Sequence, residues 1–101
     1  MKKTIAFFEI TDEEENYFRE KLPGHNLLFF YGPLHEKNIP HIKNAEIICI
    51  FIYSSITRNI LDSLPQITHI ITRSTGYDHI DVETCTKNGI KVLRVPAYCI
   101  N

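Results

Sequence analysis

A short run of small and hydroxylated residues is the part of the chain best suited to binding chemistry. Residues 74–76, Ser-Thr-Gly, follow the apolar residues 67–71. Such a turn presents backbone N–H groups that can bind the oxygen atoms of an anion. Asp78 and Asp81 come next, and their carboxylates suit the start of a helix. The segment therefore predicts a strand, a loop and a helix in succession, with the loop as an anion-binding site.

Each of these residues also has a simpler interpretation. Gly76 could serve only as a turn glycine with a positive φ angle. Arg73 could assist a carboxylate ligand, although an arginine at a strand end is more often solvated or ion-paired. Asp78 and Asp81 are expected to be helix caps and loop organisers rather than acids.

The composition and the apolar runs argue against a nucleic-acid-binding, membrane or secreted protein. The chain has 101 residues, which is one domain, with 11 basic and 12 acidic side chains, so no positive field favours nucleic acid or an anionic membrane. The longest apolar run, residues 47–53, is too short to cross a bilayer. Lys2 and Lys3 precede apolar residues, but Glu9 ends that run before a signal peptide could form.

Cysteine and histidine spacing indicates neither disulfides nor a metal site. Cys49, Cys85 and Cys99 are odd in number and far apart, which favours free thiols in a reducing compartment. The five histidines lack the spacing of zinc ligands. We therefore expect a cytoplasmic protein without a bound metal and without a membrane segment.

Apolar runs of strand length alternate with helical patterns along the chain. Thr11 and Glu14 have the spacing of a capping box for a first helix, which Pro23 and Gly24 end. Further helices are predicted around residues 39–45, at 56–64 and at 82–88. Predicted strands cover residues 3–10, 26–31, 47–53, 68–74 and 91–95.

This alternation, with right-handed crossovers, predicts an α/β fold: a flavodoxin-like, doubly wound parallel sheet of about five strands in three layers, α/β/α. Residues 1–101 form a single domain. Asn88 and Gly89 could make a hairpin turn, but after a helical pattern they favour a C-terminal cap.

Two motifs give the chain a family resemblance. Residues 73–81, Arg-Ser-Thr-Gly-Tyr-Asp-His-Ile-Asp, and residues 95–98, Val-Pro-Ala-Tyr, resemble those of the D-isomer-specific 2-hydroxyacid dehydrogenases, nearest the D-lactate dehydrogenase branch. The resemblance implies that Thr75 and Gly76 direct backbone N–H groups at a substrate carboxylate. It also implies that Tyr98 contacts the substrate and that Tyr53 lines the pocket.

The resemblance also implies an incomplete enzyme. Members have a substrate lobe and a Rossmann lobe that binds NAD, and this chain resembles the first lobe, truncated before the Rossmann domain. No two of its four glycines have the spacing of the cofactor's phosphate-binding turn, and the family's catalytic arginine, glutamate and histidine belong to the later part. Cys99 and Ile100 stand where the family commonly has Ser-Pro.

The expected function follows from that resemblance. The parent would be an NAD-dependent oxidoreductase that interconverts a small D-2-hydroxyacid, D-lactate or similar, and its 2-keto acid. The chain alone would bind no cofactor and would be inactive. In the family later residues cover part of this lobe, so we expect the isolated lobe to self-associate.

Two other interpretations stay open. One is a stand-alone flavodoxin-like or receiver-like module. A receiver would need a phosphoacceptor aspartate after the third strand, where the chain has Tyr53, Ser54 and Ser55, and residues 12–15 would repel a flavin phosphate. The other is a regulatory or assembly fragment that binds a second protein.

Overall fold

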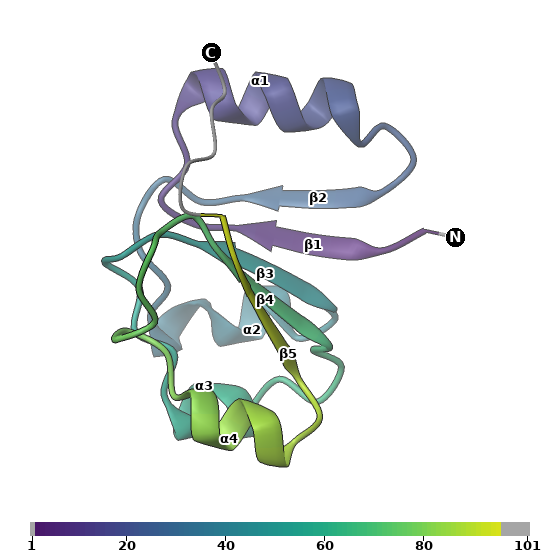
Figure 1. The fold of residues 1–101 in the computed structure, drawn as a ribbon. Coiled ribbons are helices and arrows are strands. Elements are labelled where there is room, and N and C mark those ends of the chain that lie inside the picture. The colour runs from purple at the N-terminus through teal and green to yellow at the C-terminus, as the bar shows by residue number, and fades with distance from the viewer. Residues whose placement is uncertain (1, 96–101) are drawn as a thin grey trace.

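Five parallel strands form one sheet in the computed structural model, which describes residues 2–95 (Figure 1). The strand order is β2-β1-β3-β4-β5, and all four neighbouring pairs are parallel. This order is flavodoxin-like and confirms the predicted fold class. The strands are β1 (Thr4–Phe7), β2 (Asn26–Phe29), β3 (Ile47–Ile50), β4 (His69–Thr72) and β5 (Lys91–Arg94).

Each strand lies inside its predicted range but is shorter at its carboxyl end. Residues 8–10, 30–31, 51–53, 73–74 and 95 were predicted as strand and instead lie outside the observed strands. Periodicity could not separate them, because all of these residues except Glu9 are apolar or buried. The difference matters because these loops lie at the edge of the sheet where parallel α/β folds bind ligands.

The helices follow the predicted alternation. They are α1 (Asp12–Lys21), α2 (Ile39–Ile42), α3 (Arg58–Asp62) and α4 (Val82–Lys87), with a 3-10 turn η1 (Glu36–Asn38) before α2. Thr11 caps α1, and its hydroxyl accepts from the N–H of Glu14 at 3.1 Å while the Glu14 carboxylate accepts from the N–H of Thr11 at 2.9 Å. The predicted capping box is therefore confirmed.

Helices cover both faces of the sheet, which confirms the three layers. Figure 1 shows α1 on one side of the sheet and α2, α3 and α4 on the other. The larger apolar cluster lies on the three-helix side and includes the fully buried Ile48, Ile50 and Ile70. On the α1 side the ring of Phe7 stacks on Phe18 at 4.5 Å and on Phe29 at 5.0 Å.

The end of α4 has the geometry expected of a glycine cap. Gly89 has a φ of 74°, a conformation that glycine adopts readily. Its neighbour Ile90 donates its N–H to the carbonyl of Cys85 at 2.8 Å, which closes the last turn. The Asn88–Gly89 pair is therefore a helix cap and not a hairpin turn.

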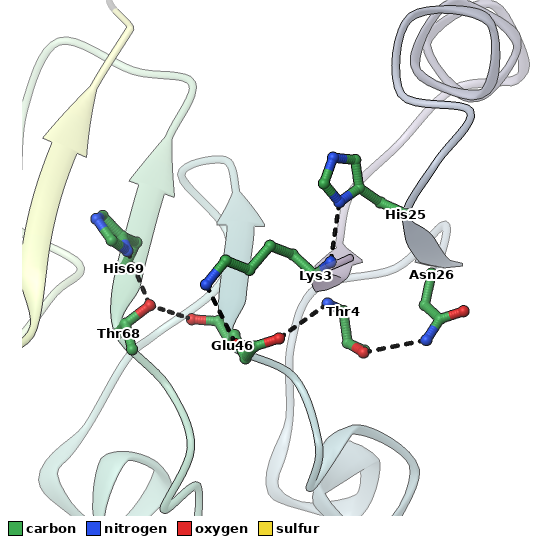
Figure 2. A network of polar contacts seen from close by, with 7 residues as sticks. All are labelled: Lys3, Thr4, His25, Asn26, Glu46, Thr68 and His69. Carbon is green, nitrogen blue, oxygen red and sulfur yellow. Dashed lines mark hydrogen bonds and ion pairs between the residues drawn. The ribbon is translucent and has the colours of Figure 1, made fainter. Parts of the chain in front are cut away.

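Glu46 ties three strands together at the amino-terminal edge of the sheet (Figure 2). Its carboxylate accepts from the N–H of Thr4 at 3.2 Å and from Nζ of Lys3 at 3.5 Å. Its carbonyl accepts from the hydroxyl of Thr68 at 3.1 Å and from the backbone N–H groups of Thr68 and His69 at the start of β4. This network fixes the mutual register of β1, β3 and β4. It therefore also fixes where each strand ends relative to its neighbours at the opposite edge of the sheet.

No helix among residues 2–95 is long and apolar enough to cross a membrane.

Candidate functional site

The loops that follow β3 and β4 border one hollow at the carboxyl-terminal edge of the sheet. β3 and β4 are hydrogen-bonded neighbours and parallel, so the segments after Ile50 and Thr72 leave the sheet side by side. The hollow has a volume of about 330 Å³ and is lined by Ile52, Gly76, Asp78 and His79. The predicted loop therefore does face a ligand-sized space.

Side-chain hydroxyls hold the loop after β4 in shape. The fully buried Thr72 places its Oγ1 2.6 Å from Oγ of Ser74 and 2.9 Å from Nε2 of His79. The Ser74 hydroxyl in turn donates to the carbonyl oxygen of Gly76 at 3.1 Å. One threonine thus connects the start of the loop to both its middle and its far end.

These bonds determine where the protons lie. The single hydroxyl proton of Ser74 goes to the Gly76 carbonyl, so Thr72 must be the donor in its bond with Ser74. Thr72 Oγ1 can then only accept from His79, whose Nε2 must carry a proton. His79 is therefore the donor and Thr72 the acceptor in the bond that closes the loop.

The loop also offers backbone donors. Within the described residues the N–H groups of Thr75 and Gly76 donate to no protein acceptor. The carbonyl of Thr75 accepts from Nη1 of Arg94 at 2.9 Å, and the Arg94 guanidinium lies 5.3 Å from the ring centre of Tyr77. Two adjacent N–H groups near a cationic side chain are suited to binding a carboxylate.

Gly76 does not have the positive φ angle that its place in a turn suggested. Positive φ among glycines of the described chain occurs at Gly89, not at Gly76, so the turn does not need glycine for its backbone angles. A Cβ at Gly76 would meet no atom within 4 Å. What glycine provides here is open space beside the hollow.

Tyr53 lies on the neighbouring loop but does not line the hollow. Its side chain is 73% exposed, and its ring meets Phe51 edge-on at 6.4 Å. The residue before it, Ile52, lines the hollow in its place. Tyr98 lies outside the described residues.

Arg73 is ion-paired, one of the two simpler interpretations of an arginine at a strand end, and it is buried rather than solvated. It is 4% exposed and makes an ion pair with Glu14 at 3.8 Å. Its guanidinium donates to the carbonyls of Phe8 at 2.9 Å and Glu9 at 2.8 Å and to Sγ of Cys49 at 3.2 Å. Arg73 therefore joins the end of β4 to the end of β1 inside the fold.

The two aspartates of the motif differ in role. Asp81 is the N-cap of α4, as predicted, and the N–H and hydroxyl of Thr84 donate to it at 3.1 and 2.8 Å. These bonds to the ionised form lower the pKa of Asp81. Asp78, also predicted to be a cap, instead lines the hollow.

Sequence reasoning missed two residues of this edge. His79 was considered only as a metal ligand, although its place three residues after Gly76 in the same loop was a usable signal. Glu9 was considered only as the residue that ends the first apolar run, yet its carboxylate accepts three hydrogen bonds from residues 51–54. No signal in the sequence links positions more than 40 residues apart.

The described residues contain no group of three or more side chains that could hold a metal ion.

Known proteins resemble this chain in both sequence and fold. Residues 5–101 match the family described as D-isomer specific 2-hydroxyacid dehydrogenase, catalytic domain. The chain is 34% identical over 98 residues to a 2-hydroxyacid dehydrogenase homolog of Zymomonas mobilis, covering 95% of this chain and 28% of that protein. It is also 34% identical to the D-lactate dehydrogenase of Escherichia coli, covering 93% of this chain and 30% of that enzyme.

Solved structures agree with the sequence match. The fold superposes on the Aquifex aeolicus D-lactate dehydrogenase, solved with NAD and lactic acid, with a TM-score of 0.86 at 33% identity over 94% of this chain and 28% of that one. For the apo D-lactate dehydrogenase of Escherichia coli the TM-score is 0.82 at 28% identity, over 95% and 32%. The chain thus spans about a third or less of the length of these relatives. Its match over residues 5–101 shows that it belongs to the D-isomer specific 2-hydroxyacid dehydrogenase family.

Proposed function

We propose that this chain is the substrate-binding lobe of an NAD-dependent oxidoreductase that interconverts a small D-2-hydroxyacid, such as D-lactate, and its 2-keto acid. Residues 1–101 would be the N-terminal lobe, followed in the complete enzyme by a Rossmann domain. One observation carries the proposal: within the described residues, the adjacent N–H groups of Thr75 and Gly76 have no protein acceptor, and Gly76 lines a hollow at the carboxyl-terminal edge of the sheet.

The residues of the loop suit a 2-keto acid. The two N–H groups would bind the carboxylate, and the oxygen at carbon 2 would remain for the rest of the enzyme to bind. The Thr72 and Ser74 hydroxyls would keep the N–H groups at a fixed spacing, because both are buried and engaged with the loop itself. A carboxylate held in this way is oriented before it meets the rest of the enzyme.

We propose that the cofactor binds outside this chain. Four acidic residues occupy the first turn of α1, where a nucleotide phosphate would sit in a flavodoxin-like site, and they would repel it. The four glycines also lack the spacing of a pyrophosphate-binding turn. We therefore assign NAD, and the catalytic side chains that act with it, to a different part of the protein, and we expect the chain alone to be inactive.

An NMR titration of the uniformly ¹⁵N-labelled chain tests the carboxylate site. Pyruvate and D-lactate should shift the amide resonances of Thr75 and Gly76 in a saturable way, because an ionised acceptor strongly deshields the N–H proton it binds. Acetate, which has the carboxylate without the oxygen at carbon 2, should bind the same amides. Shifts confined to other residues, or no shift at Thr75 and Gly76 at high millimolar ligand, would contradict the proposal.

Two tyrosines belong to the proposal with different support. Tyr53 is on a loop that borders the hollow, and the residue is exposed, so it would be available to a substrate held between two lobes. For Tyr98 the support is the resemblance of residues 95–98 to the family motif. Replacement of either tyrosine should affect substrate affinity rather than folding.

We also propose that the isolated lobe self-associates, with a second copy of the chain as the occupant of an apolar groove on the α1 side of the sheet. Phe7, Ile47 and Ile71 line this groove, and Val95 extends it to the open edge strand β5, where Leu93 is 48% exposed. Figure 1 shows no helix of the described chain over β3, β4 and β5 on this side. Exposed apolar surface of this kind favours association.

Sedimentation velocity from 5 to 500 µM tests the association. The wild-type chain should sediment faster as its concentration rises, and Leu93→Lys should reduce that dependence because it places a charge at the contact. Thr86→Lys, on the exposed side of α4, is the matched control. A wild-type chain that stays monomeric over the whole range would contradict the proposal.

The buried, unpaired Cys49 and Cys85 support a reducing compartment, and we propose that the protein is located in the cytoplasm.

A further inference from the structure

Glu9 has an unusual backbone conformation at the end of β1. Its φ angle is 57°, the left-handed region that residues other than glycine, asparagine and aspartate rarely adopt. Such a conformation persists only where the surroundings determine it, and it is common at functional sites. The contacts of Glu9 show what determines it.

The backbone of Glu9 is held from two sides. Its N–H donates to the carbonyl of Gly32 at 3.0 Å, and its carbonyl accepts from Nη2 of the buried Arg73 at 2.8 Å. These bonds connect Glu9 to the segment after β2 and to the end of β4. They fix the direction in which its side chain leaves the strand.

The carboxylate of Glu9 points to the loop after β3. Oε2 accepts from the N–H of Phe51 at 3.1 Å and from the Ser54 hydroxyl at 2.5 Å, and Oε1 accepts from the N–H of Tyr53 at 2.9 Å. The buried Ser54 also accepts from the N–H of Leu34 at 2.9 Å, so its proton is committed to Glu9. All three donors therefore need an acceptor, and both carboxylate oxygens are in use.

We propose that Glu9 is a positioning residue for substrate binding: its carboxylate holds residues 51–54 so that Ile52 borders the hollow and Tyr53 projects beside it. This inference rests on the proposed function, because it assigns Glu9 a role toward the same site. Glu9 does not touch the hollow itself and would act through the backbone of Phe51 and Tyr53.

Glutamine at position 9 is the sharpest test because it keeps the shape and changes the chemistry. An amide has one acceptor oxygen, and its NH₂ group cannot accept from an N–H. If the oxygen serves Phe51 and Ser54, the NH₂ group faces the N–H of Tyr53 and releases that end of the loop. Glu9→Asn is a second variant, since asparagine tolerates a positive φ but is too short to reach the loop.

Amide hydrogen exchange on the 101-residue chain measures the first step. In Glu9→Gln the N–H of Tyr53 should exchange about tenfold faster or more, the loss expected when a hydrogen bond to a charged group is removed. Amides of β3 should keep their protection. Glu20→Gln, an exposed glutamate of α1, is the matched control. Unchanged protection of both Phe51 and Tyr53 in Glu9→Gln would overturn the inference.

A double-mutant cycle in the complete dehydrogenase measures the second step. Glu9→Gln and Tyr53→Ala should each raise the KM for the 2-keto acid, with kcat little changed, and the double variant should be no worse than Tyr53→Ala alone. A merely structural role for Glu9 would make the two effects additive, and additivity would overturn the inference while leaving Tyr53 in the site. An unchanged KM in Tyr53→Ala would instead remove Tyr53 from the proposed function, and the role of Glu9 with it.

Discussion

Nε2 of His79 lies 2.9 Å from Oγ1 of Thr72, although His79 follows the end of β4 by seven positions, on the far side of the loop. The bond closes the loop on itself. Because Thr72 is fully buried, its hydroxyl cannot exchange these partners for water. The positions of the Thr75 and Gly76 N–H groups are therefore set by a threonine that faces the interior.

Thr72→Val tests this closure with a residue of nearly the same shape. It removes one hydroxyl and leaves Ser74 and the His79 ring without their shared partner, so unfolding free energy should fall by about 1–3 kcal/mol. Urea denaturation of the chain measures the change. Thr86→Val, on the exposed side of α4, should cost much less. Equal effects of the two substitutions would contradict the closure.

Gly76 variants should separate folding from ligand binding. Because a Cβ at this position meets open space and φ is not positive, Gly76→Ala should unfold at the wild-type urea midpoint within error. Gly76→Val should also fold, but its branched side chain would obstruct the carboxylate. We expect a much higher KM for the 2-keto acid in the complete enzyme, with unchanged affinity for NAD. A well-folded Gly76→Val enzyme with a wild-type KM would exclude this loop from the site.

Tyr98→Phe tests the second motif, although the residue lies outside the described part of the chain. If its hydroxyl binds the substrate, removal should cost roughly 0.5–1.5 kcal/mol, or about threefold to tenfold in kcat/KM. Steady-state kinetics of the complete enzyme supply the measurement. A variant with wild-type kcat/KM would reduce Tyr98 to a packing role.

Asp81 should make the free energy of unfolding depend on pH. The N–H and hydroxyl of Thr84 lower the pKa of the folded Asp81 below its ordinary value of 3.8, so folding favours the ionised form. This contribution to stability is fully present above the unfolded pKa and is lost as the pH falls through the folded pKa. Asp81→Asn should therefore be less stable than wild type at pH 7, and the gap should narrow below about pH 4. Urea denaturation at both pH values checks this, with Glu20→Gln as the control. A gap that is the same at pH 7 and pH 2.5 would contradict it.

The buried thiols should resist alkylation. Burial raises the pKa of Cys49, although the nearby Arg73 guanidinium acts in the opposite direction, and burial also raises the pKa of Cys85. Both thiols should therefore react much more slowly with iodoacetamide at pH 8 in the native chain than in 8 M urea. Peptide mapping by mass spectrometry gives the rate for each cysteine. Equal native and denatured rates at Cys49 would show that the α1 side of the sheet opens readily.

The sequence predicted the fold well because local signals agree with one another. Continuous apolar runs, the capping box at Thr11 and the glycine cap at Gly89 each depend on neighbouring residues, and all three are observed. Strand ends were less predictable. Whether a residue such as Phe51 continues a ladder depends on a partner strand far away in the sequence, and here the Glu9 carboxylate takes the Phe51 N–H instead.

The candidate site was predictable only where it is local. Gly76 was found because the loop motif is contiguous, but the reason it is glycine required the structure. An ion pair was one expectation for Arg73, but the sequence could not identify its partners, because the carbonyls that accept from it follow β1 and its ion-pair partner lies on α1, about 60 residues earlier. Glu9 escaped notice for the same reason, since its partners follow β3. Contacts between distant strand ends are not visible in residue periodicity.

The strand order has a consequence for how the chain folds during synthesis. β1 and β2 are synthesised first and are neighbours in the sheet, and β3, β4 and β5 each lie next to a strand that precedes them in the chain, always on the side away from β2. The sheet can therefore grow from one edge in the order of translation, without inserting a strand between two that are already paired. Until β3 is synthesised, the edge of β1 opposite β2 has no partner strand. The Glu9 carboxylate likewise has no N–H donors from Phe51 and Tyr53, which are translated more than 40 residues later.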